Sequence, residues 1–182
     1  MDLDQNGVID TYDQMAIGGT ENPEIVYGFG VNLRWKDLDF GAMFQGIGRT
    51  WRILSSNIMP ASNKGSMYNI FDNYQDRWTV DNQSQDVFYP RADYGPNANN
   101  SQKSTWWLRN MSFLRLKNVE LGYSCPKKWL QGFVISNARV FVRGTNLLTF
   151  SKFDLWDPEL ATGDGAKYPA MKSVSVGFDI TF

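Results

Sequence analysis

The first residues of the chain gather several oxygen-bearing side chains around one glycine. The segment reads D-L-D-Q-N-G-V-I-D-T-Y-D over residues 2–13. Calcium takes about six to eight hard oxygen ligands, and alternating carboxylates before a sharp glycine turn can supply them. The candidate ligands are Asp2, Asp4, Asn6, the carbonyl of Val8, Asp10 and Asp13. This spacing predicts a Ca2+ site, although an Asp-Asn-Gly turn without metal uses the same residue types.

A second group of residues suits the binding of a sugar or another flat-faced ligand. Trp51, Trp78 and Trp156 fall in long connections rather than in regular alternating segments. Aromatic rings in such positions can stack on a ligand, contact a covering partner or pack within their own loops. We treat the three tryptophans as candidate ligand-binding residues. Trp106 and Trp107 directly precede an alternating segment, and we expect them in an aromatic girdle at a membrane interface or packed within a loop.

The sequence offers little for catalysis. It has no histidine and one cysteine, Cys125, so the usual nucleophile–base pairs and zinc ligand sets cannot form. Asp154, Asp157 and Glu159 have the side chains of a glycosidase carboxylate pair, but nothing in their spacing enforces that geometry. We expect a solvated acidic loop there and no enzymatic activity.

Composition limits the possible partners. The 182 residues include 18 basic and 19 acidic ones, for a net charge of -1, so the clustered basic surface of a nucleic-acid-binding protein is not expected. No run of about 18 apolar residues exists that would form a transmembrane helix. Met1 is followed by Asp2, without the basic and apolar stretches of a secretory signal. A barrel protein with this sequence is therefore expected to begin upstream of Met1.

Five segments alternate apolar and polar residues with the period of a β-strand. They cover 27–35, 38–45, about 113–123, about 138–146 and 174–182. The last segment is the most regular, because its apolar residues share one face while small and polar residues share the other. The apolar residues are Val174, Val176, Phe178, Ile180 and Phe182.

The connections between these segments alternate in length. Lys36 and Asp37 alone separate the first pair, which predicts a tight antiparallel hairpin. Residues 48–112 and 147–172 form long connections, and outer-membrane barrels have this pattern of short periplasmic turns and long external loops. Five strands cannot close such a barrel, which needs about eight, so the chain would be a fragment. The alternative is a soluble secreted β-sandwich that binds carbohydrate and calcium and buries its apolar faces under a second sheet.

Several motifs resemble the end of SusC/RagA-type TonB-dependent transporters, in family order along essentially the whole chain. They are D-L-D-Q-N-G-V-I-D (2–10), F-Q-G-I-G (44–48), D-R-W-T (76–79), S-T-W-W-L-R-N (104–110), F-L-R-L-K-N-V-E-L-G-Y (113–123), R-G-T-N-L-L-T-F-S (143–151), D-P-E (157–159) and G-F-D-I-T-F (177–182).

The resemblance implies an all-β fold in which residues 1–182 form the C-terminal part of a large transmembrane β-barrel with long extracellular loops. A complete barrel of this kind has about 22 strands, so the plug domain and most strands would lie outside this sequence. The resemblance also implies a bacterial outer-membrane importer of oligosaccharides, or sometimes of peptides. Its partners would be a SusD-like surface lipoprotein, the TonB complex through the missing N-terminal part, and outer-membrane lipid.

Overall fold

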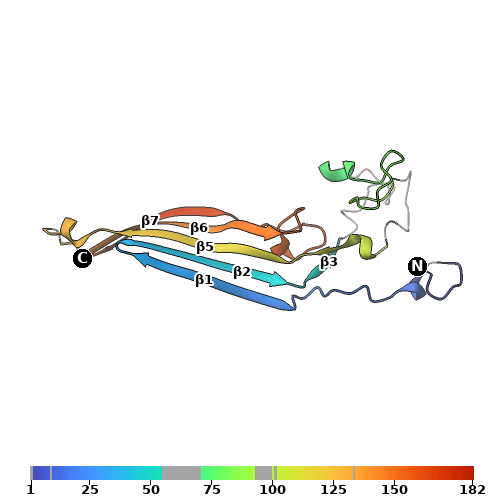
Figure 1. Cartoon of the computed structure of the whole chain (residues 1–182), viewed down its shortest axis with the longest axis horizontal. Helices are drawn as coiled ribbons and strands as arrows, with labels where there is room; N and C mark the ends of the chain where they lie inside the picture. The colour runs from blue at the N-terminus through green and yellow to red at the C-terminus, as the bar shows by residue number, and fades with distance from the viewer. Residues whose placement is uncertain (1, 9, 55–70, 93–99, 101, 133) are drawn as a thin grey trace.

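The chain forms one long antiparallel sheet with its large loops gathered at one end (Figure 1). The computed structural model describes residues 2–8, 10–54, 71–92, 100, 102–132 and 134–182. The main sheet has five strands in the order β1-β2-β5-β6-β7, and β3 pairs with β4 in a second, two-stranded sheet. The bounds are β1 Ile25–Trp35, β2 Leu38–Gly48, β3 Trp51–Ile53, β4 Leu108–Asn110, β5 Phe113–Ser124, β6 Asn137–Ser151 and β7 Ser173–Thr181.

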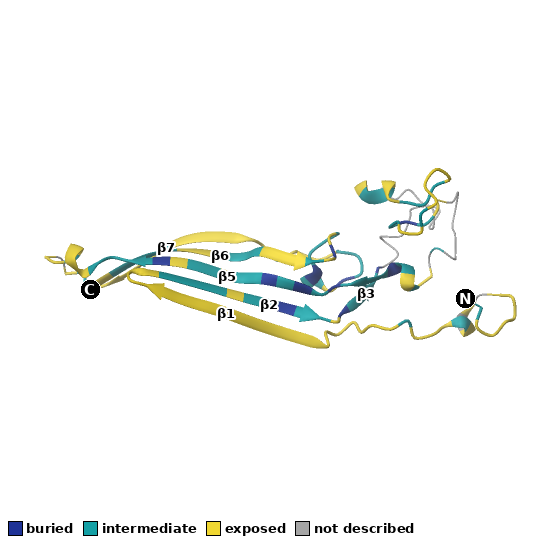
Figure 2. Cartoon of the chain, in the orientation of Figure 1, coloured by how far each residue is buried: buried dark blue, intermediate teal, exposed yellow. Residues whose placement is uncertain are grey.

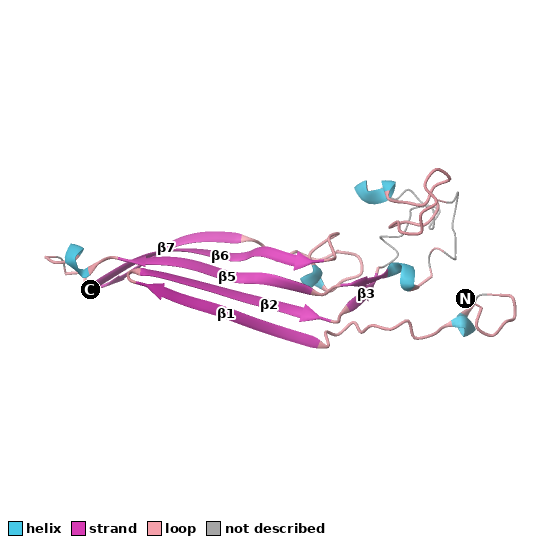
Figure 3. Cartoon of the chain, in the orientation of Figure 1, coloured by secondary structure: helices cyan, strands magenta, loops and turns pink. Residues whose placement is uncertain are grey.

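Helical structure in the described residues is limited to short 3-10 turns (Figure 3). These are η1 Thr11–Asp13, η3 Asp72–Gln75, η4 Thr105–Trp107, η5 Lys127–Trp129 and η6 Pro158–Leu160. Within the described part of the chain, no helix is long and apolar enough to cross a membrane. The predicted all-β class is confirmed.

The β1–β2 hairpin has the predicted two-residue turn. Trp35 pairs with Leu38, and the register continues to the pair Ile25 and Gly48. Lys36 enters the turn with a φ of 54°, the left-handed conformation that a tight hairpin turn between right-twisted strands requires. This turn lies at one end of the sheet, and the long connections lie at the other (Figure 1).

A β-bulge explains why the third alternating segment looked irregular in the sequence. In β5 the partners of Phe44 and Met43 are Leu116 and Asn118, so Lys117 is the extra residue. A bulge shifts the strand period by one residue. The apolar positions therefore change phase between Leu116 and Val119 without leaving their face of the sheet.

One face of the main sheet is apolar across all five strands. A single row of paired residues runs from β1 to β7 and contains Leu33, Phe40, Leu121, Val142 and Val176. Four of these five side chains are between 45% and 62% exposed, and Figure 2 shows the exposure along β1 and β7. A soluble sandwich would bury this face under a second sheet, but β3 and β4 pair only three residues each. The exposed apolar face is typical of a barrel wall in lipid.

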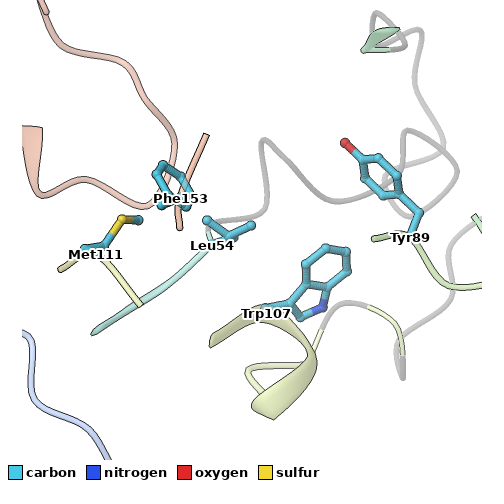
Figure 4. Packing of buried hydrophobic residues seen from close by; sticks show 5 residues of the cluster. All are labelled: Leu54, Tyr89, Trp107, Met111 and Phe153. Atoms are coloured by element: carbon cyan, nitrogen blue, oxygen red, sulfur yellow. The ribbon is translucent and has the colours of Figure 1, made fainter. Parts of the chain in front are cut away.

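The buried core is formed by residues of the long connections, and Figure 4 shows how five of its side chains lie. Trp107 is 1% exposed and packs in a cluster with Tyr89 and Leu54. The ring centroids of Trp107 and Tyr89 are 6.3 Å apart at 64°, an edge-to-face arrangement. Trp106 packs against the same cluster, and its Nε1 donates to the carbonyl of Phe88 at 3.0 Å. Both tryptophans therefore pack within the loops rather than in a lipid-facing girdle.

Two features of the strands were not anticipated. The short β3–β4 pair was missed because three residues are too few to establish a period. β6 continues to Ser151 instead of ending near Asn146. Asn146 has a φ of 54°, and this local irregularity interrupts the alternation without ending the pairing between β5 and β6.

Gly46 lies at a close contact between the strands of the hairpin and β5. Its partner Tyr27 reaches across it, and the Tyr27 hydroxyl donates to the carbonyl of Phe113 at 3.1 Å. A Cβ on Gly46 would overlap the Phe113 carbonyl oxygen and lie 2.5 Å from the Tyr27 ring. Gly46, the first glycine of F-Q-G-I-G, therefore permits a contact that spans β1, β2 and β5.

Candidate functional site

The face opposite the apolar one carries a connected network of charges. The Arg139 guanidinium in β6 lies 2.5 Å from Asp39 of β2, 2.7 Å from Glu120 of β5 and 3.4 Å from Asp179 of β7. Arg143 extends the network, because its Nε lies 2.6 Å from Glu120. Charges confined to one face would be stranded in lipid if they faced outward, so this is the face that suits a polar lumen.

Two structural details shape this polar face. The Phe141 ring is flanked by Arg139 and Arg143, whose guanidinium carbons lie 5.0 and 5.2 Å from its centroid. Opposite Phe141, Gly177 leaves the space that the ring occupies. Further along, an open hollow of about 1050 Å³ is lined by Gly28, Gly30, Gly41 and their charged neighbours. The charged residues that line it are Arg34, Asp39, Glu120 and Arg143.

The loop after β6 is attached to the sheet by ion pairs at the long-loop end. Arg115 is 2% exposed and contacts Asp157 through Nη2 and Glu159 through Nη1, the latter at 3.2 Å. Lys117, which the bulge adds to β5, places its Nζ 2.7 Å from Glu159. Asp157 also caps η6 by accepting the Glu159 N–H at 3.0 Å. The D-P-E motif therefore forms the anchor of this loop.

The expectation of a solvated acidic loop is wrong for two of its three carboxylates. The Asp157 side chain is largely buried against Arg115, and Glu159 bridges Arg115 and Lys117. The partners lie about forty positions away in the sequence, so no local pattern could have indicated them. Asp154 stays exposed, as expected.

The three candidate tryptophans lie in three different segments. Trp156 packs on Phe153 with ring centroids 4.8 Å apart, and Gly165 lies against its ring. Trp51 begins β3, and Gly19, at a φ of 81°, approaches its ring closely. Trp78 is half-buried and has the Arg91 guanidinium 5.9 Å from its centroid. No ring contact between these tryptophans is found in the described residues.

The acidic amino-terminal loop brings three of its predicted ligands together. Carboxylate oxygens of Asp2, Asp4 and Asp13 lie within 4.8 Å of one another. Gly7 turns with a φ of 82°, and its N–H donates to Asp2 Oδ2 at 2.8 Å. The other Asp2 oxygen, Oδ1, is buried and has no hydrogen-bond partner in the described chain. This oxygen-rich group with an unpaired carboxylate atom fits a hard divalent cation.

The remaining predicted ligands have other contacts. Asn6 donates from Nδ2 to Asp4 Oδ2 at 2.9 Å, and its Oδ1 accepts the Val8 N–H at 2.7 Å. Asp10 caps η1 by accepting the Tyr12 N–H at 2.8 Å, so its carboxylate is not among the three clustered ones. Asn6 therefore borders the cluster, whereas Asp10 shapes the turn that brings Asp13 back to it.

Backbone hydrogen bonds hold the pKa of the Asp13 carboxyl below its ordinary value of 3.8. The larger contribution comes from the Asp10 N–H at 2.9 Å and the next from the Leu3 N–H at 2.5 Å. A lowered folded-state pKa adds stability that is present above the ordinary value and lost as the pH falls through the lowered one. Asp13 is therefore charged at neutral pH and available to a cation.

Sequence comparison finds relatives along the whole chain, although no family model matches it. The chain is 32% identical over 196 residues to TonB-dependent receptor P26 of Formosa agariphila. It is 28% identical over 198 residues to TonB-dependent receptor P3 of the same organism. The alignments cover 100% of this chain and 19% and 18% of the relatives, so the chain spans about one-fifth of their length. TonB-dependent receptor SusC of Bacteroides thetaiotaomicron is 33% identical over 81 residues, 43% of this chain and 8% of SusC.

Solved structures share the fold at similar identity. The structure of the RagAB peptide transporter matches with a TM-score of 0.72 and 34% identity, over 91% of this chain and 18% of that chain. The RagAB peptide importer in the closed-closed state matches with a TM-score of 0.71 and 31% identity, over 97% of this chain and 20% of that chain. The full-length alignments and the shared fold agree with the resemblance identified in the sequence. The chain belongs to the SusC/RagA family of TonB-dependent receptors.

Proposed function

We propose that this chain forms part of the wall and outer mouth of a TonB-dependent importer in a bacterial outer membrane. The importer takes up oligosaccharides or peptides together with a SusD-like surface lipoprotein, and it draws energy through the TonB complex. The observation that carries the proposal is the two-faced sheet. The apolar row from Leu33 to Val176 is exposed on one side, and the network around Arg139 occupies the other.

Each face has a function in this proposal. The apolar face contacts lipid, because burying it against hydrocarbon is favourable and needs no protein partner. The polar face lines the solute path, where paired charges and the glycine-lined hollow expose hydrogen-bonding groups to a hydrated ligand. The loops at the end opposite the β1–β2 turn form the external mouth. The cluster around Trp107 gives these loops their own core.

Uptake by the full-length receptor tests the proposal. Deleting its gene in the source bacterium is expected to abolish uptake of one class from a panel of labelled oligosaccharides and peptides. Collapsing the proton gradient should abolish the same uptake in the wild type, because TonB needs that energy. Unchanged uptake of every panel member after deletion contradicts the function, and uptake that survives loss of the gradient contradicts the energy source.

Among the three candidate tryptophans, Trp78 has only one ring contact within the described residues, the Arg91 guanidinium 5.9 Å from its centroid. Trp51 lies against Gly19, and Trp156 packs on Phe153. Trp78→Ala in the full-length receptor should weaken the binding of the imported ligand by roughly tenfold, the loss expected for one stacked aromatic ring. The matched control is Trp129→Ala at the opposite end of the sheet, which should leave affinity unchanged. Equal affinities of wild type and Trp78→Ala would remove Trp78 from the binding site.

We also propose that the amino-terminal acidic loop binds one Ca2+ through Asp2, Asp4 and Asp13. The support is the convergence of three carboxylates and the unpaired Asp2 Oδ1. The bound ion would stiffen an external loop, because it ties residues at both ends of segment 2–13 to one centre.

Metal content tests this site. The double substitution Asp2→Asn and Asp4→Asn should remove one equivalent of calcium from the full-length protein, measured by elemental mass spectrometry after dialysis at micromolar Ca2+. The control replaces Asp81 and Asp86, two exposed carboxylates outside the cluster, and should retain the ion. A wild type without bound calcium, or a double variant that keeps it, refutes the site.

A further inference from the structure

The short-turn end of the sheet carries three lysines without carboxylate partners. Lys36 lies in the β1–β2 turn, and Lys127 and Lys128 begin η5. All three are exposed and none forms an ion pair within the described residues. Asp37 is the one acidic residue in the two connections 36–37 and 125–136. These two connections therefore carry three positive charges and one negative charge.

Two exposed tryptophans accompany the lysines. Trp35 is 68% and Trp129 67% exposed. Lys36 lies over the Trp35 ring with its Nζ 4.9 Å from the centroid. Exposed tryptophan next to unpaired lysine is typical of the headgroup region of a membrane, where the ring meets the hydrocarbon boundary and the ammonium reaches phosphate.

The two turns are neighbours in space and border the apolar face. The Ser124 N–H donates to the Asp37 carbonyl at 2.8 Å, which joins the β1–β2 turn to the start of the β5–β6 connection. Trp35 pairs with Leu38, and Leu38 pairs with Tyr123, so the last paired residues before the β1–β2 turn belong to the apolar face. Figure 1 shows both connections at the same end as β7's carboxyl terminus.

At the opposite end of the sheet, several basic side chains form ion pairs within the protein. Arg49 pairs with Glu24 at 3.3 Å and Arg52 with Glu21 at 2.5 Å. Arg115 and Lys117 pair with the loop carboxylates. Lys152 and Lys172 at that end are exposed and form no ion pair within the described residues, but Trp35 and Trp129 are the only exposed tryptophans in the described part of the chain. The combination of unpaired lysines with exposed tryptophans is therefore a property of the short-turn end.

We infer that Lys36, Lys127 and Lys128, together with Trp35 and Trp129, form a binding surface for the phosphates of anionic phospholipid headgroups. The surface lies where the apolar face meets water on the short-turn side. This inference rests on the proposed membrane placement. Each lysine near an anionic bilayer surface adds attraction, and the tryptophan rings fix the depth at which the ammonium groups sit.

Lipid retention by the full-length receptor tests the surface. The protein is reconstituted in nanodiscs of phosphatidylethanolamine with a minor fraction of phosphatidylglycerol, and the lipids that remain after mild extraction are counted by native mass spectrometry. Lys127→Gln with Lys128→Gln should lower the apparent affinity for phosphatidylglycerol by roughly tenfold to thirtyfold. Retention of phosphatidylethanolamine should change little.

The matched control replaces two exposed lysines at the long-loop end, Lys152→Gln with Lys172→Gln. That variant should keep the wild-type preference for phosphatidylglycerol. The inference is overturned if the Lys127/Lys128 variant keeps the preference, or if the control loses it equally. A wild type that enters the bilayer but shows no preference overturns the inference alone, whereas a wild type that never enters the bilayer overturns the membrane placement as well.

Discussion

Replacing Arg115 by methionine is expected to release the loop after β6 from the sheet. Arg115 is 2% exposed and contacts both Asp157 and Glu159. Methionine keeps much of the volume but leaves Asp157 buried without its cation, and breaking one side of a buried pair costs about 3–5 kcal/mol. The measurement is hydrogen exchange on the full-length receptor in detergent, where protection of the peptide that contains η6 should fall by that amount.

Two further variants distinguish loss of the buried ion pair from a general destabilisation of the protein. Arg143→Met removes a half-exposed arginine that pairs with Glu120, and it should cost below about 1 kcal/mol because water screens the pair. The second is Arg115→Met combined with Asp157→Asn, which removes both charges. This double variant should recover part of the protection, since no unpaired buried carboxylate is left. Protection of η6 that is unchanged in Arg115→Met contradicts the anchor.

Substitution of Gly46 by alanine is expected to disturb the pairing of β2 with β5. The added Cβ would overlap the backbone carbonyl oxygen of Phe113 and press on the Tyr27 ring. The carbonyl belongs to the strand ladder and cannot move without straining it, so the cost should be about 2–3 kcal/mol, in the upper range for overpacking. Urea unfolding of the full-length receptor from lipid vesicles measures the change in free energy.

Gly28 offers a control in the same hairpin. A Cβ there would meet the Phe44 carbonyl oxygen at 3.4 Å, an ordinary van der Waals contact. Gly28→Ala should therefore change the free energy of unfolding by less than about 1 kcal/mol, because neither overlap nor a left-handed backbone is involved. If both alanine variants cost the same, the close contact at Gly46 is not what constrains this position.

The amphipathic sheet determines which environment the protein needs. With the apolar face exposed from β1 to β7 and both edge strands unpaired, an isolated sheet would expose backbone donors and acceptors as well as apolar side chains. A barrel removes the edges by pairing them with further strands, and lipid covers the apolar face. The buried core at the loop end gives the external segments stability of their own.

Alternation alone predicted much of the sheet. The strand period is two residues, so apolar and polar positions in β1, β2 and β7 assign each side chain to a face without any knowledge of the neighbours. The two-residue gap at Lys36 and Asp37 likewise determined the antiparallel pairing of β1 and β2. The clustering of the amino-terminal carboxylates could also be predicted, because they are close in sequence and a glycine turn brings them together.

The remaining features depend on residues that are far apart in the sequence. Arg139 meets Asp39 across 100 positions, and Arg115 meets Asp157 across 42. Arg139 and Asp39 become neighbours because β5 pairs with both β2 and β6. The bulge in β5 adds Lys117 to the polar side. Which residues are apolar, which are charged and how they alternate can be read directly from the sequence. Which charges neutralise each other depends on the fold, because strand register and loop packing set the distances between the charged groups.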